Sequence, residues 1–80
     1  MPVVFREKGY RVFYYSHEPG EPPHVHVDRG DASAKVWLNP VALARNIGFP
    51  SHELTAIIAM VRAHKEEILE HWHGYFGSRR

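Results

Sequence analysis

The sequence contains no cysteine, so it can form no disulfide bond and offers no thiolate ligand for a zinc site. No run of apolar residues approaches the length of about 18 that a membrane-spanning helix needs. The first residues show no basic segment followed by a long apolar stretch, so no signal peptide is predicted. From these absences we expect a cytoplasmic protein that does not enter a membrane.

A large excess of charge of one sign is also missing. Ten Lys and Arg residues stand against nine Asp and Glu residues, which gives a formal net charge of +1. This balance does not predict a surface that attracts nucleic acid or membranes through bulk charge. The unusual count is that of histidine: seven imidazoles can gain positive charge as the pH falls through about 6.5.

The length of 80 residues predicts one domain over residues 1–80, with residues 77–80 frayed. A domain of this size buries roughly 60–65% of its surface. Its stability is therefore expected to be a few kcal/mol unless a protein partner or a second copy adds to it.

Four segments have the β-branched and aromatic composition of strands, namely 3–6, 10–16, 24–28 and 32–38. Gly9 and Gly30 lie in the short links, which favours antiparallel hairpins. Residues 41–47 are ambiguous between a helix and a strand. A hairpin turn at Asn39-Pro40 would bring the chain back along the sheet, which favours an edge strand over residues 41–47.

Residues 51 to about 73 have the spacing of an amphipathic helix. Ser51 is suited to the N-cap, and Glu53 lies in the first turn, where the helix dipole favours negative charge. Apolar residues recur every three or four positions, as one helix face requires: Leu54, Ile57, Ile58, Val61, Ile68, Leu69 and Trp72. The pattern predicts one continuous helix of roughly 33 Å.

The segment Pro22-Pro23-His24-Val25-His26-Val27-Asp28 indicates how sheet and helix pack. Because side chains alternate along a strand, the two valines share one face, and the two histidines and the aspartate share the other. The valine face is expected to pack against the helix together with Ala34, Val36 and Leu38. We therefore predict an α+β fold: a small antiparallel sheet of four to five strands with one long C-terminal helix packed on one face. The opposite face would display His24, His26, Asp28, Lys35 and Trp37 and stay open unless a partner covers it.

Two histidines two positions apart on a strand can bind one metal ion, because their side chains stand about 6–7 Å apart. Zinc or iron would need at least one more ligand, for which Asp28 and His17 are the nearby candidates. A polar outer face whose histidines form hydrogen bonds across the sheet is the simpler interpretation. We expect no cofactor, with a divalent metal at His24 and His26 as the alternative.

The same pair can instead exchange protons, since one histidine near neutral pH can act as general base and another as general acid. Cleavage of RNA without a metal also needs a cation at the phosphate, which Lys35 or Arg11 would supply. Tyr14 or Tyr15, with Trp37, would stack bases. The low net charge argues against this interpretation. Aromatic residues packed at a core edge or under a partner explain the pattern more simply, and Trp is frequent at interfaces.

Several stretches together resemble a known family: Tyr10–Ser16, Pro22–Val27, Ala34–Leu38, Gly48-Phe49 before Glu53-Leu54, and Glu66–Trp72. They are similar to a widespread family of small bacterial proteins catalogued as domain of unknown function forty-one-sixty. The resemblance covers nearly the whole chain, and its most specific part is the His-Val-His-Val core with the Lys-Val-Trp-Leu strand. The family has no established activity. Its members are often encoded beside another small family, and such pairs are suspected toxin–antitoxin modules, so the resemblance implies a protein partner without giving His24 or His26 a role.

We therefore expect a protein of unknown activity that binds a protein partner in a bacterial two-gene, toxin–antitoxin-like module. The expected binding surface comprises Tyr15, Asp28, Lys35 and Trp37, beside the two histidines. One alternative is a metal-free endoribonuclease toxin with His24 and His26 as catalytic residues, and a second is a metal-binding protein that uses the same pair. A homo-oligomer and contact with nucleic acid stay open, and the sequence does not decide whether the protein is an enzyme.

Overall fold

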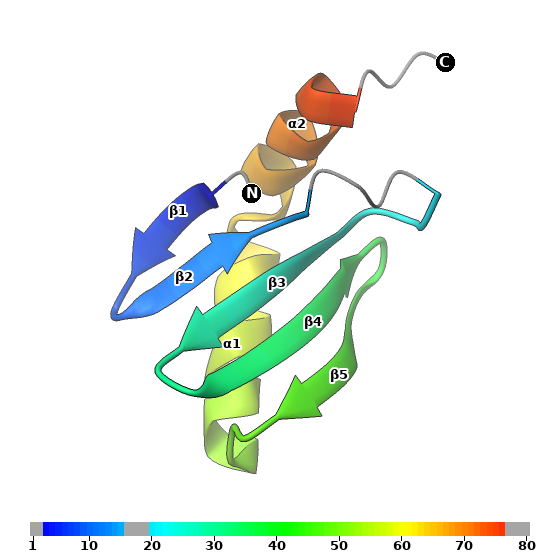
Figure 1. The fold of residues 1–80 in the computed structure, drawn as a ribbon. Helices are drawn as coiled ribbons and strands as arrows, with labels where there is room; N and C mark the ends of the chain where they lie inside the picture. The colour runs from blue at the N-terminus through cyan, green and yellow to red at the C-terminus, as the bar shows by residue number, and fades with distance from the viewer. Residues whose placement is uncertain (1–2, 16–19, 77–80) are drawn as a thin grey trace.

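The computed structural model of the protein describes the backbone of residues 3–15 and 20–76. Five strands and two helices follow one another along the chain (Figure 1). They are β1 (Val3–Glu7), β2 (Tyr10–Phe13), β3 (His24–Arg29), β4 (Ala32–Leu38), β5 (Val41–Ile47), α1 (Ser51–Ala63) and α2 (Lys65–Phe76). The α+β class and the edge strand over residues 41–47 are confirmed, and residues 77–80 lie outside the described part of the chain.

The strands form one antiparallel sheet in the order β1-β2-β3-β4-β5, so each strand pairs with its neighbour in the sequence. Short turns make this possible. Lys8 and Gly9 both have positive φ, 53° and 85°, as a two-residue type I′ hairpin requires. Gly30 has φ 60° at the first position of the next two-residue turn, and Asn39-Pro40, whose peptide bond is cis, forms the third.

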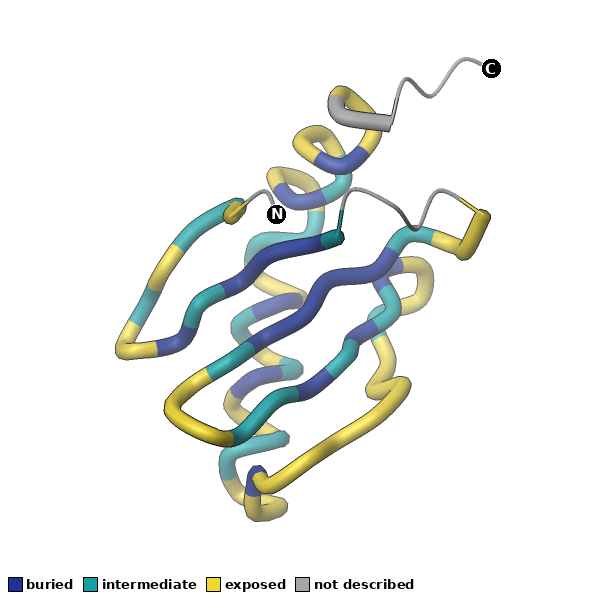
Figure 2. Tube along the Cα trace, viewed as in Figure 1, coloured by how far each residue is buried: buried dark blue, intermediate teal, exposed yellow. Residues whose placement is uncertain are grey.

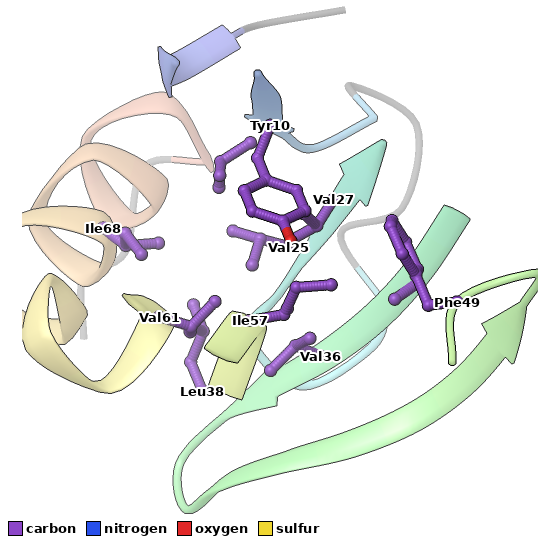
Figure 3. Packing of buried hydrophobic residues seen from close by; sticks show 11 residues of the cluster. Tyr10, Val25, Val27, Val36, Leu38, Phe49, Ile57, Val61 and Ile68 are labelled. Atoms are coloured by element: carbon purple, nitrogen blue, oxygen red, sulfur yellow. The ribbon is translucent and has the colours of Figure 1, made fainter. Parts of the chain in front are cut away.

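The register of β3 against β4 determines which side chains meet the helices. Val25 lies opposite Val36 and Val27 opposite Ala34, and all four are buried. Their side of the sheet faces Ile57 of α1 (Figure 3). The larger buried cluster also includes Tyr10, Val12, Leu38, Phe49, Val61 and Ile68. The predicted assignment of the valines to the helix-covered face is therefore confirmed.

The helical region differs from the prediction of one long helix. It consists of α1 and α2, which meet at His64 with φ −107° and ψ 14°. The N–H of His64 is shared between the carbonyls of Met60 and Val61, which closes the last turn of α1. The His64 ring contacts Phe5 of β1, with centroids 4.5 Å apart, and its Nε2 lies 3.1 Å from Oε1 of Glu7. The break thus lies where β1 contacts the helical region, and residues 62–67 around it include no strongly apolar side chain.

The start of α1 is also shifted by one residue from the prediction. Pro50 occupies the N-cap position with an extended backbone, and no side chain caps the helix. Ser51 is instead the first helical residue, and its carbonyl accepts a 3.3 Å hydrogen bond from the Thr55 hydroxyl. Glu53 lies in the first turn as expected.

The two outer strands differ in exposure from the centre of the sheet. Figure 2 shows β3 buried over most of its length and β5 exposed over nearly all of its length. None of the described helices is long and apolar enough to cross a membrane.

Candidate binding surface

The sheet face that points away from α1, here called the outer face, carries most of the predicted site residues. The strand register aligns its side chains in rows across the sheet. One row contains Arg6, Arg11, Asp28 and Ser33, a second contains Phe13, His26, Lys35 and Arg45, and a third contains His24 and Trp37. Tyr15 joins the face through ring contacts with Phe13 and His26.

His24 and His26 lie on the predicted face, but they are not displayed to solvent. Their side chains are buried, with residue exposures of 1% and 6%. Their rings stand 5.3 Å apart, edge to face. Trp37 contacts His24 with centroids 5.8 Å apart, and Tyr15 contacts His26 at 4.6 Å. The expectation of two open imidazoles is wrong, since both rings are buried and pack against aromatic neighbours.

His24 is also held by the segment that precedes β3. Its Nδ1 lies 2.9 Å from the carbonyl oxygen of Pro22, so this nitrogen carries the hydrogen and donates it. The Glu21 carboxylate lies 3.8 Å from the same nitrogen. These contacts with Pro22 and Glu21 orient the His24 ring.

Two cations cover aromatic rings of the outer face. The Arg11 guanidinium lies 4.6 Å from the Phe13 ring centroid and 3.2 Å from a carboxylate oxygen of Asp28. The Lys35 ammonium lies 4.9 Å from the Trp37 ring centroid and 2.7 Å from Oε1 of Glu21. Each cation combines a cation–π contact with an ion pair, which fixes long side chains that would otherwise be mobile.

The predicted surface residues thus fall into two groups. Tyr15, Lys35 and Trp37 lie around the histidines: Tyr15 contacts His26, and Trp37, which Lys35 covers, contacts His24. Asp28 lies farther along β3 and lines a hollow of about 280 Å³ together with Arg6, Gly9, Arg11, Arg29 and Gly30. Oδ1 of Asp28 is buried and accepts no hydrogen bond from a described residue.

A third metal ligand beside the two histidines is not found in the described part of the chain. No group of three or more His, Asp or Glu side chains converges there. His17, which the sequence analysis considered as a ligand, lies outside the described residues.

Two contributors to the outer face were not identified from the sequence, Phe13 and Arg6. Phe13 follows Val12, and two adjacent apolar residues do not reveal which of them enters the core. Arg6 lies directly opposite Arg11. The two-residue turn Lys8-Gly9 was the available signal, because it sets the register of the whole hairpin.

Polar contacts on the helix-covered side connect the sheet to α1. The Tyr10 hydroxyl donates a 2.8 Å hydrogen bond to Oε1 of Glu53, and Arg29 forms an ion pair with the same oxygen. Burial raises the pKa of the Tyr10 hydroxyl, and the bond to Glu53 raises it further. The Arg29 guanidinium lies 4.6 Å from the Tyr10 ring centroid.

His64 has carboxylates on both sides of its ring. Nδ1 lies 3.1 Å from Oε1 of Glu67 on α2, and Nε2 lies 3.1 Å from Oε1 of Glu7 on β1. The hydrogen bond to Glu67, followed by that to Glu7, raises the pKa of His64 against the opposing effect of burial. The ring is therefore more easily protonated here than in an unfolded chain.

Comparison with known families matches residues 9–73 to a domain of unknown function, DUF4160. The chain belongs to this family. The match includes β2 to β5, α1 and most of α2, and with them the buried histidines and the Lys35–Trp37 pair. No match was found among curated proteins or among solved structures. Family membership in DUF4160 thus supports the recognised motifs and assigns no activity.

Proposed function

We propose that this DUF4160 domain is a binding module that associates with a protein partner through its edge strand β5. The observation that carries the proposal is the exposure of this strand. All of its residues from Ala42 to Ile47 are exposed, and two of them are large and apolar: Leu43 is 40% and Ile47 is 56% exposed.

Such a strand offers a row of backbone donors and acceptors to another chain. Exposed edges of this kind are usually short, charged, bulged or covered, because they otherwise pair with other strands. β5 has seven residues, one bulge near Leu43 and a single charged residue, Arg45. A partner strand added to β5 would extend the sheet and cover both apolar side chains, as in recognition by strand addition.

The partner we favour is the product of a neighbouring gene, in a bacterial two-gene module of toxin–antitoxin type. The family resemblance supports this choice, and the small size of the domain agrees with it, since a small core gains stability from association. Tyr15, Lys35 and Trp37 on the outer face would extend the contact beyond β5.

The test is co-purification of the chain with the neighbouring gene product. In the double variant Leu43→Lys/Ile47→Lys, two lysines on the edge strand should abolish the association, because charge on an edge opposes strand pairing. Val3→Lys is the matched control: Val3 is 36% exposed on β1 at the opposite edge of the sheet. Retention of the partner by the β5 variant, or equal loss in the control, would contradict the proposal.

The endoribonuclease and metal-binding alternatives receive less support from the burial of His24 and His26. A general base must reach its substrate, and these rings lie beneath Tyr15 and Trp37. Expression of the wild type and of His24→Ala/His26→Ala, compared by growth and RNA integrity, tests the nuclease alternative directly. Stoichiometric zinc in the purified wild type, absent from the same variant, would support the metal alternative.

A further inference from the structure

The formal net charge of +1 conceals an uneven distribution between the two sides of the molecule. The outer face carries four basic residues, Arg6, Arg11, Lys35 and Arg45, and two acidic residues, Glu21 and Asp28. The region from Ser51 to Phe76 carries the reverse, with Glu53, Glu66, Glu67 and Glu70 against Arg62 and Lys65. The chain is balanced as a whole, but it presents one basic sheet face and one acidic helical side. The low net charge therefore does not exclude attraction of nucleic acid to the outer face.

Two of these cations differ from Arg11 and Lys35, each of which forms an ion pair with a carboxylate. Arg6 and Arg45 are exposed and form no ion pair with any residue in the described ranges. Arg6 lies directly opposite Arg11, an arrangement that costs stability unless an anion lies between or above the two guanidiniums. The hollow of about 280 Å³ at this position is lined by three arginines and one carboxylate residue, namely Arg6, Arg11, Arg29 and Asp28. Guanidinium groups suit phosphate well, because their planar N–H groups can bind two of its oxygens.

Aromatic rings lie on the same face as the two arginines without ion pairs. Tyr15 and Trp37 keep part of their surface exposed, and they rest on the buried rings of His26 and His24. The underlying layer fixes their orientation, so little conformational entropy would be lost when a planar ligand stacks on them. From β1 to β5 the sheet spans four strand spacings, about 19 Å. A sheet face that combines fixed aromatic platforms with basic residues is an arrangement that binds single-stranded nucleic acid.

We propose that the outer face binds single-stranded nucleic acid, with phosphates at Arg6 and Arg45 and bases stacked on Tyr15 and Trp37. Arg11 and Lys35 add positive charge along the path, while their ion pairs with Asp28 and Glu21 keep them in position. The recognition does not depend on sequence, because stacking accepts every base and phosphate is common to all nucleotides. This site shares Tyr15, Lys35 and Trp37 with the proposed extension of the partner contact and takes Arg45 from β5, but strand addition depends on Leu43 and Ile47, which do not belong to it, so each proposal is tested with its own variants.

The test is fluorescence anisotropy with the full chain and fluorescein-labelled single-stranded RNA and DNA of mixed sequence. We expect binding that weakens steeply between about 50 and 200 mM salt, because phosphate contacts release counterions. Arg6→Gln/Arg45→Gln should weaken binding and lower the salt slope by about 1.4, at about 0.7 for each lost contact to a single strand. Trp37→Ala should weaken binding about fivefold or more through lost stacking.

The matched control is Arg62→Gln/Lys65→Gln, which removes the same charge from the helical side and should leave the affinity unchanged. Equal weakening in both double variants would overturn the proposal, since it would show attraction by net charge alone. Absence of binding to both oligonucleotides at about 50 mM salt would also overturn it. Competition is the last check. The proposal would be overturned if a duplex of that sequence, or poly-glutamate at equal charge concentration, displaced the labelled strand as effectively as the unlabelled single strand does.

Discussion

The hydroxyl oxygen of Tyr14 lies 2.8 Å from Nδ1 of His71 and joins the end of β2 to α2. Tyr14 is fully buried, whereas His71 lies at the surface. Tyr14→Phe keeps the ring and removes the hydroxyl, so we expect the free energy of unfolding to fall by about 0.5–1.5 kcal/mol. Urea denaturation measures this loss. Amide hydrogen exchange should increase more in α2 than in α1, and unchanged exchange in α2 would show that the contact does not hold this helix.

Ile57 and Ile47 are the same residue type in opposite environments. Ile57 of α1 is fully buried, and Ile47 of β5 is 56% exposed. Ile57→Ala should destabilise the protein by about 2–5 kcal/mol, since it removes buried methyl groups and leaves a cavity. Ile47→Ala should change stability by less than about 0.5 kcal/mol. If urea denaturation showed a similar loss of unfolding free energy in both variants, Ile47 would have to be buried, which would contradict the exposure of β5.

His24 should act as a structural residue of the sheet. His24→Ala would leave a cavity beside Trp37 and remove the donor to the Pro22 carbonyl, so we expect a loss of about 2 kcal/mol or more. His73→Ala, at an exposed position of α2, is the matched control and should have little effect. If both variants were as stable as the wild type in chemical denaturation, the structural role of His24 would be ruled out.

His64 should make stability depend on pH in a defined direction. Because its pKa is raised by Glu67 and Glu7, its contribution is fully present below the unfolded pKa of about 6.5 and is lost as the pH rises through the folded pKa. The wild type should therefore lose thermal stability relative to His64→Gln as the pH rises above about 6.5. The difference in Tm between the two proteins at each pH isolates this histidine from the other six. A difference that stays constant across the range, or grows toward high pH, would exclude the assignment.

The prediction of the sheet from the sequence succeeded where the signals were local. Alternation of His24, Val25, His26 and Val27 determined which side chains face the helices, because neighbouring residues of a strand must point in opposite directions. Gly9 and Gly30 indicated turns through the positive φ values that they adopt. The return after Asn39-Pro40 likewise indicated the edge strand β5.

The prediction of one continuous helix failed because the helix breaks at a place set by contacts with residues far away in the sequence. The spacing of apolar residues from Leu54 to Trp72 is compatible with one continuous helix, and nothing local marks His64 as a break. The break coincides with contacts from Phe5 and Glu7, which are 59 and 57 positions away in the chain. Only the packed structure brings these residues to the helix.

The sequence by itself determined the positions of the short turns and, for β3 and β4, which side chains share each face of the sheet. These follow from the period of a strand and from turn chemistry, both of which act over a few residues. The tertiary structure decided how far each side chain is exposed, because exposure depends on neighbours that come from other strands. It therefore buried His24 and His26 beneath Trp37 and Tyr15, left β5 uncovered, and placed Arg6 beside Arg11 on a face whose charge the composition does not reveal.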